Sequence, residues 1–315
     1  MTTITKHHDE VRDIVEALCK KSQRCFGRQR GRVYKQAQHF SPFYRDFILK
    51  VIKNNSLKIR SDYQGGSYMP LGHGSPEGKL QKRGKGRIDA SISDLDTLPH
   101  ELGHAVDYWF GKQTLTSSVI LSNGKTLREI FDAEFSKKFE DILEDIMDEF
   151  AFILNTNIQE NAFNILMLNM NTYKRLLATK DRFKRRELQK KLYESGFVEV
   201  YYQLYTKGWY KLIQEKYGPV IDAMSSRVEL KHYFLVCHTV EYYKQNKAIA
   251  VEEFFANLFA EKVTSEHVAF KELKRLLPES FAAFEELFYI FYDRLMNNKR
   301  FTDVSIKVET EVVNA

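Results

Sequence analysis

The feature that most constrains this chain is the run LPHELGHAVD at residues 98–107. His100 and His104 are four positions apart, so in a helix their imidazoles lie on one face, one turn apart. Pro99 suits the first turn of such a helix, and Gly111 can end it. Two imidazoles placed in this way can bind one metal ion. We therefore predict a metal-binding helix here, the alternative being an ordinary buried pair of histidines.

Glu101 directly follows the first of these histidines. From that position a carboxylate can reach a water on the metal rather than the metal itself, which suits a general base. Zinc lowers the pKa of such a water toward about 7, so that hydroxide is available at neutral pH. The pattern predicts a Zn²⁺ hydrolase site with Glu101 as the base. Asp107 lies on the same face and could orient a ligand, with a surface or helix-end role as the alternative.

A third metal ligand must come from elsewhere, because a catalytic zinc site usually has three protein ligands and one open position. Metzincins would have a glycine and a histidine at positions 107 and 110, where this chain has Asp107 and Phe110. That class is therefore excluded. The segment 248–263 predicts an amphipathic core helix with two adjacent carboxylates, Glu252 and Glu253.

Glu253 is the preferred third ligand, because it lies opposite the large apolar stripe of this helix, on a face that a second helix can approach closely. Glu252 lies at the edge of the stripe, which is more typical of a solvent-facing or supporting carboxylate, and it remains open as a ligand. Asn257 could support a ligand by a hydrogen bond. The helical neighbours of Glu253 are mostly small and apolar: Ile249, Ala256, Asn257 and Ala260.

The run HELGHAVD, together with the later EEFFANLFAE, is similar to the catalytic domain of anthrax lethal factor and related gluzincins, including Pro-Pro endopeptidases. Comparable HExxH domains occur in phage head-associated proteins. The resemblance covers residues 66–110 and 238–262. It implies a zincin-like metallopeptidase of the α+β class, mostly helical with a small twisted sheet. By match to the family's motif, the glutamate that completes the zinc site is Glu253.

The family also has a tyrosine shortly before that glutamate, placed to assist the oxyanion of the reaction. This chain has Tyr242 and Tyr243, and the longer spacing to Glu253 leaves open which of them corresponds. His238 is a further candidate for stabilising the oxyanion, with an ordinary core position beside Cys237 as the alternative.

A break in the helical pattern at residues 58–86 predicts loops and strands, because glycine, proline and basic residues are frequent there. Short alternating pieces at 66–71 and 87–92 predict strands of a small sheet. The piece GSYMP at 66–70 resembles the stretch before the family's active-site strand. The resemblance implies that strand 87–92 lines the cleft and that an extended substrate pairs with its edge.

Helical spacing dominates the rest of the chain. Within the long helical region, an acidic stretch at 129–149 precedes a basic stretch at 174–191, and either they face each other or they are two solvated faces. We expect an N-terminal helical segment at 1–60, a zincin-like domain at 61–300 with a helical insertion at about 112–235, and a polar tail at 301–315.

Composition narrows the cellular context. With 315 residues and 43% hydrophobic content, the chain can build a substantial core. No segment approaches the roughly 20 apolar residues of a membrane span, and the N-terminus lacks a signal core, so we expect no membrane partner and synthesis in the cytoplasm. A virion-associated location and export without a signal peptide both stay open. The three cysteines form no CxxC motif, which favours a reducing compartment.

The sequence thus predicts a zinc metallopeptidase that acts on a peptide or protein substrate. The alternative is a phage protein, or another structural or interaction protein, with a non-catalytic metal site. Nucleic-acid binding through the basic clusters at 20–35 and 79–87 is disfavoured, because aromatic interleaving there is poor and the net charge is only +6. Neither the substrate nor the oligomeric state follows from the sequence.

Overall fold

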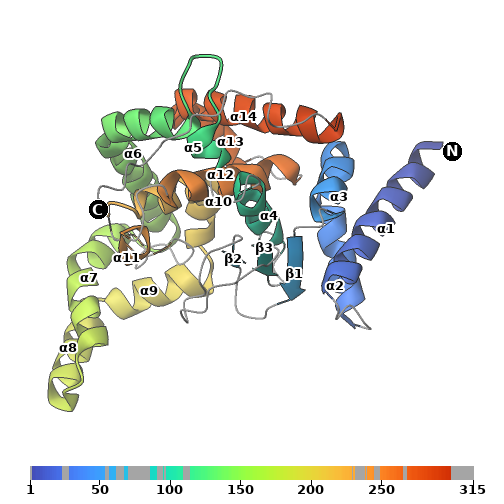
Figure 1. Ribbon diagram of the computed structural model, residues 1–315. Coiled ribbons are helices and arrows are strands. Elements are labelled where there is room, and N and C mark those ends of the chain that lie inside the picture. Colours follow the sequence, from blue (N-terminus) through green and yellow to red (C-terminus); the bar gives the residue numbers. More distant parts are fainter. Residues whose placement is uncertain are drawn as a thin grey trace, which may run out of the picture. The chain divides into compact units, whose positions relative to one another are not determined.

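The computed structural model divides into two compact units. The first contains Met1–Ser136 and Asn246–Ala315, and the second contains Lys137–Gln245 (Figure 1). The structure describes residues 2–22, 28–53, 57–61, 67–69, 86–90, 95, 97–108, 114–228, 230, 238, 240–244, 249–264 and 268–298. The predicted polar tail lies outside these residues. None of the described helices is long and apolar enough to cross a membrane.

The first unit is built around one helix that is buried on most of its surface. This helix is α12 (Ile249–Val263), and its large apolar side chains are fully buried. The other elements are α1 (Thr2–Ser22), α2 (Arg28–His39), η1 (Pro42–Tyr44), α3 (Arg45–Lys53), α4 (Thr97–Asp107), α5 (Leu115–Ser118), the start of α6 (Leu127–Asn157), α13 (Val268–Leu276) and α14 (Pro278–Met296). Buried rings from three helices meet at Phe47, which packs against Phe259 of α12 and against Phe288 and Phe291 of α14.

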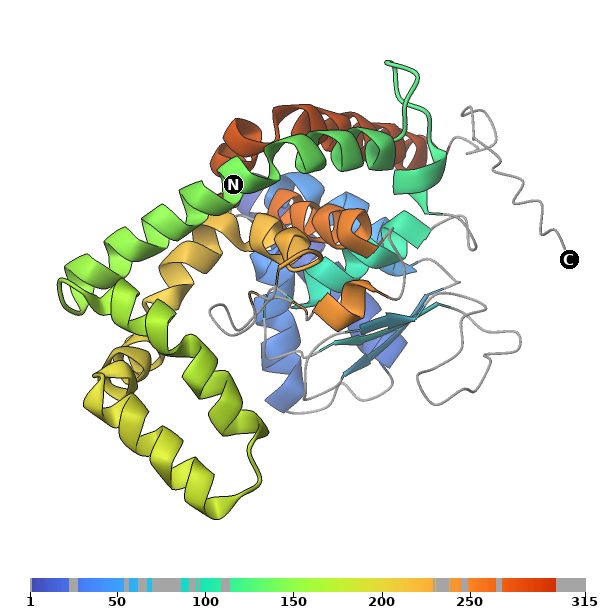
Figure 2. The ribbon, with the colours of Figure 1, turned by 90° about the vertical axis from the view of Figure 1, so that its left-hand side faces the viewer.

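Three short strands lie beside α4 in this unit (Figure 2). They are β1 (Leu57–Ser61), β2 (Ser67–Met69) and β3 (Gly86–Ala90), in the order β1-β3-β2. β1 runs parallel to β3, with Ile59 opposite Ile88, and both of these side chains are buried. β2 runs antiparallel to β3. β3 is therefore the central strand, hydrogen-bonded on both sides.

Two sequence predictions are wrong at this point. The α+β, zincin-like class with a twisted sheet is corrected to a predominantly helical one, because most of the described residues lie in helices and the strands comprise only five, three and five residues. The prediction that a substrate pairs with the edge of strand 87–92 is also wrong. β3 is the central strand, and both of its edges are already hydrogen-bonded, one to β1 and the other to β2.

The division of the chain also differs from the expected one. Residues 1–60 are not a separate segment, because α3 packs on α14 and β1 pairs with β3. The start of α6 belongs to the first unit, where Phe131 contacts Phe254 of α12. Glu134 holds it there by accepting hydrogen bonds from the backbone N–H and the hydroxyl of Ser280, at the start of α14. The helical insertion is thus 137–245 rather than about 112–235.

The described elements of the second unit are all helices, joined by turns. The remainder of α6 lies in this unit. It is followed by α7 (Ala162–Ala178), α8 (Arg182–Glu194), α9 (Phe197–Thr206), α10 (Tyr210–Met224) and α11 (Val240–Tyr243). α7, α8 and α9 pack on one another, and the buried apolar residues between them include Leu166, Leu188 and Phe197. Gly196 provides the tight turn from α8 to α9 with a φ of +77°, a conformation that favours glycine.

Helices α4 and α12 approach each other closely at Gly103. A Cβ atom added at Gly103 would lie 2.8 Å from the Cα of Ala256 and 3.1 Å from the Cβ of Phe259. Neither is the flexible end of a side chain, so a larger residue at 103 must push the helices apart. The small-residue face predicted around Glu253 is therefore the face on which α4 packs.

We expect Gly103→Ala to separate these helices and to destabilise the protein by about 1–3 kcal/mol through overpacking. The matched control is Gly31→Ala in α2, where an added Cβ meets nothing within 4 Å. That change should stabilise the helix by about 0.5–1 kcal/mol. Denaturant unfolding of both variants measures the two effects, and equal free energies of unfolding would contradict the packing role of Gly103.

Candidate metal centre

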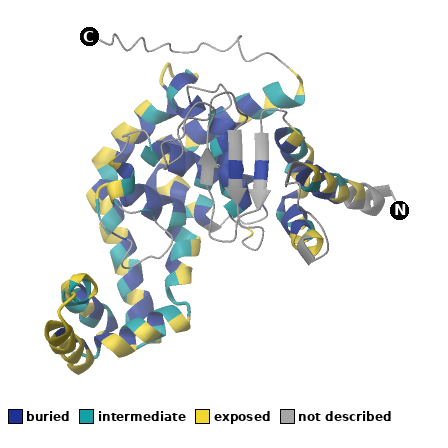
Figure 3. Cartoon of the chain, turned by 60° about the horizontal axis from the view of Figure 1, so that its bottom comes forward, coloured by how far each residue is buried: buried dark blue, intermediate teal, exposed yellow. Residues whose placement is uncertain are grey.

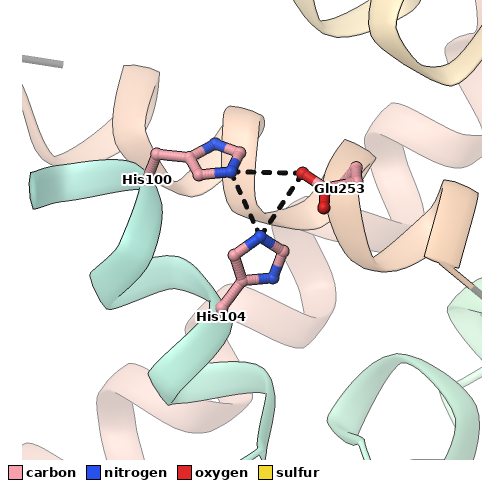
Figure 4. A group of neighbouring side chains, drawn as sticks. All are labelled: His100, His104 and Glu253. Carbon is pink, nitrogen blue, oxygen red and sulfur yellow. Dashed lines mark hydrogen bonds and ion pairs between the residues drawn. The ribbon is translucent and has the colours of Figure 1, made fainter. Parts of the chain in front are cut away.

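Two helices bring three potential metal ligands to one point (Figure 4). His100 and His104 project from the same face of α4, whose opposite face is anchored by buried side chains such as Leu102 and Val106. Glu253 projects from α12 toward both imidazoles. Among the described residues, these three form a buried or half-buried group that could hold a metal ion.

The three ligand atoms form a nearly equilateral triangle. The Nε2 atoms of His100 and His104 are 3.1 Å apart, and they lie 3.2 and 3.3 Å from Oε2 of Glu253. A tetrahedral zinc ion with bonds of about 2.0–2.1 Å separates its ligand atoms by about 3.3 Å. The triangle therefore has the size that a single tetrahedral ion requires, with a fourth position left over.

A second contact fixes the orientation of one ligand. Nδ1 of His100 lies 2.9 Å from Oδ1 of Asn257, one turn after Glu253 on α12. Because an amide oxygen only accepts, Nδ1 carries the proton and Nε2 of the neutral ring presents its lone pair to the metal position. Asn257 thus supports a ligand, which is the role that its spacing from Glu253 predicts.

Acidic side chains are concentrated at this centre, where a bound cation would balance their negative charge. Four carboxylates within these two helices are almost fully buried: Glu101, Asp107, Glu252 and Glu253 are 5%, 0%, 7% and 1% exposed. Buried carboxylates are stable only when they are paired, hydrogen-bonded or bound to a metal. The surplus of buried acid fits a divalent cation and does not fit an anion site.

In the metal-free chain, a proton on His104 supplies part of this positive charge. Burial acts to lower the pKa of His104, but the charge and hydrogen bond of Glu253 outweigh it and raise this pKa to about 10. Glu101 adds to the rise, so its carboxylate lies within electrostatic reach of His104. Burial acts to raise the pKa of Glu253, but His104 and His100 hold it well below its usual range.

The other two carboxylates are tied to neighbouring side chains. Burial raises the pKa of Glu252, against the hydrogen bond that Tyr108 donates to its Oε2 atom over 3.0 Å. Glu252 is therefore buried and supporting, and Glu253 is the glutamate that meets the histidines. Burial, and then the charge of Glu252, raise the pKa of Asp107 to about 8. Asp107 accepts hydrogen bonds from the backbone N–H and the hydroxyl of Thr116, so it fastens the end of α4 to α5.

The predicted oxyanion residues lie in the second unit and form a cluster there. One oxygen of Asp222 accepts from the backbone N–H of His238 at 2.9 Å, from its ring Nδ1 at 3.1 Å and from the hydroxyl of Tyr243 at 2.8 Å. Tyr242 stacks on the His238 ring, with 4.1 Å between the ring centroids. The catalytic roles of these three residues stay predictions from the sequence.

Three partners in these networks were not predicted from the sequence. Tyr108 follows His104 by one helical turn, and that spacing is a signal which could have been used. Thr116 reaches Asp107 only because α5 folds back on α4, and Asp222 reaches His238 across 16 positions. Neither contact has a local sequence pattern, so only the folded chain reveals it.

We expect metal binding to release about one proton per ion at about pH 7.5, because zinc requires a neutral imidazole and the raised pKa keeps His104 protonated in the metal-free chain. The apparent affinity for zinc should therefore rise with pH up to about pH 10 and fall in acid. Calorimetric titration with zinc, in two buffers of different ionisation enthalpy, counts the protons.

Glu253→Gln is the control for this measurement. Without the carboxylate charge, burial lowers the pKa of His104, so fewer protons should be released and binding should be weaker. Tight binding by the unmodified chain without proton release would contradict the assigned charge state.

Comparison with known proteins adds nothing to this geometry. No protein-family model matches the chain, and no match was found among curated proteins or among solved structures.

Proposed function

We propose that this chain is a zinc-dependent endopeptidase, and the observation that carries the proposal is the triangle of His100, His104 and Glu253 with Glu101 beside it. Two imidazole nitrogens, one carboxylate oxygen and an open position are the ligand set of a catalytic zinc site. The same set also suits ferrous iron. The buried Glu101, next to the first ligand on α4, favours hydrolysis, because a hydrolytic site needs a base at that place.

When bound, zinc would act as a Lewis acid that polarises the scissile carbonyl and makes the attacking water more acidic. His100, His104 and Glu253 would hold it. Glu101 takes the proton of the attacking water as the water oxygen bonds to the carbonyl carbon. Glu101 then passes that proton to the amide nitrogen as the C–N bond breaks, so the products are a carboxylic acid and an amine.

The neighbouring contacts support these roles. Asn257 keeps His100 in the tautomer that a ligand needs, and the close packing at Gly103 sets the distance between α4 and α12. Stabilisation of the oxyanion is assigned to Tyr243 or Tyr242 on the sequence resemblance, with His238 as a further candidate from the sequence. The proposed substrate is a peptide or protein.

Glu101→Gln tests the mechanism. We expect this variant to keep its zinc, because Glu101 is not a ligand, and to lose at least about 100-fold in cleavage rate, because the base is gone. Metal content by mass spectrometry and digestion of a proteome-derived peptide library measure the two properties separately. Undiminished cleavage by Glu101→Gln would overturn the mechanism.

Glu253→Gln is the matched control, because it removes a ligand rather than the base. It should lose metal and activity together. Zinc in the unmodified chain without cleavage of any peptide would instead favour the non-catalytic alternative, a structural or interaction protein stabilised by its metal. Iron in place of zinc would contradict the hydrolase.

A further inference from the structure

The helix α8 in the second unit is exposed on most of its surface (Figure 3). Of its 13 residues, only Leu188 and Leu192 are buried, on the side that packs against α7 and α9. Asp181 caps its N-terminus by accepting hydrogen bonds from the backbone N–H groups of Phe183 and Lys184, so the helix is well formed up to its first turn. The metal centre in the first unit makes no use of this surface.

The segment 174–194, which comprises the end of α7 and all of α8, carries the whole charge excess of the chain. It has nine basic and three acidic residues, a net charge of +6. The complete chain is also +6, so the rest of it is neutral, with 39 residues of each sign. Two of its lysines form i,i+4 ion pairs, Lys190 with Glu194 and Lys191 with Glu187, and such exposed pairs are weak and easily exchanged for another anion.

Two aromatic side chains flank two basic ones along the outer face of α8. Phe183, Arg186, Lys190 and Tyr193 are spaced by three, four and three positions, which places them on one stripe opposite the buried leucines. We name these four residues the α8 stripe. Its rings are exposed to an unusual degree, Phe183 by 80% and Tyr193 by 76%. Exposed rings beside cations offer a partner both stacking and charge contacts.

The chemistry of the α8 stripe fits one class of partner best. A membrane surface would require a continuous apolar face, which Arg186 and Lys190 interrupt. An acidic protein would pair with the cations but would not need the exposed rings. A single-stranded nucleic acid presents both a phosphate and the face of a base at every nucleotide, so one strand can place phosphates against the two central cations and stack bases on the two outer rings.

We propose that the α8 stripe binds single-stranded nucleic acid, independently of the metal centre. Arg186 and Lys190 contact phosphates, and Phe183 and Tyr193 stack on bases. The clusters at 20–35 and 79–87 are basic too, but they have few interleaved aromatic residues. The proposal therefore concerns α8 alone.

Fluorescence anisotropy with labelled oligo-dT and oligo-U of about 20 nucleotides, longer than a typical single-strand site, tests the proposal on the full chain. The double variant Arg186→Glu with Lys190→Glu should weaken binding at least about tenfold and reduce the salt dependence by a slope of about 1.4, that of two phosphate contacts. The control is Arg30→Glu with Arg32→Glu on the exposed surface of α2, which removes the same charge and should leave the salt slope nearly unchanged.

The rings are tested with Phe183→Ala and Tyr193→Ala together. Each lost stacking contact should weaken binding about fivefold or more. Phe152→Ala with Tyr202→Ala is the matched control, because these rings are also exposed, by 67% and 62%, but lie outside the α8 stripe. All four variants change exposed residues, and circular dichroism with thermal unfolding verifies that they stay folded.

Equal losses in the two charge-reversed variants would show a general effect of net charge and would overturn the proposal. Equal losses in the two ring variants would also overturn it. The proposal is likewise overturned if neither oligonucleotide binds at about 50 mM salt. Binding of phosphatidylserine vesicles through the α8 stripe, without binding of any oligonucleotide, would overturn it too. None of these outcomes affects the peptidase proposal, whose readouts are metal content and cleavage.

Discussion

The close contact between α4 and α12 is the interaction on which the candidate site depends. Gly103 lies between the two histidines in sequence, and the absence of its side chain lets α4 lie against the backbone of Ala256. Helix axes that are a few tenths of an ångström further apart would enlarge the triangle of ligand atoms, and a tetrahedral ion tolerates little enlargement. The two helices therefore position the site as much as its ligands do.

The burial of α12 explains why this contact is rigid. Its apolar side chains fill the centre of the first unit, where Phe254 meets Phe131 and Phe259 meets Phe47. A helix held on several sides cannot move without opening the core, and dense packing makes such movement costly. Burial also removes water from four carboxylates, and a proton on His104 offsets the charge of Glu253 when no metal is bound. Stability and metal affinity are thus linked through the same residues.

The second unit has a different character. Its helices bury an apolar layer and leave α8 facing solvent with two basic side chains between two aromatic ones. In a chain whose remaining charges cancel, a single helix with this pattern is a local property rather than a consequence of overall composition. The metal centre and the α8 stripe lie in different units, so each can be altered and measured without the other.

The sequence by itself determined the local features. The spacing of His100 and His104 and the small-residue face around Glu253 follow from helical periodicity, and periodicity requires no knowledge of the fold. Tertiary structure decided what periodicity cannot encode: that Glu253 rather than Glu252 meets the histidines, that Asp107 binds Thr116, and that β3 is a central strand in a predominantly helical chain. These outcomes depend on which distant segments pack together, and that choice is made by the free energy of the whole core.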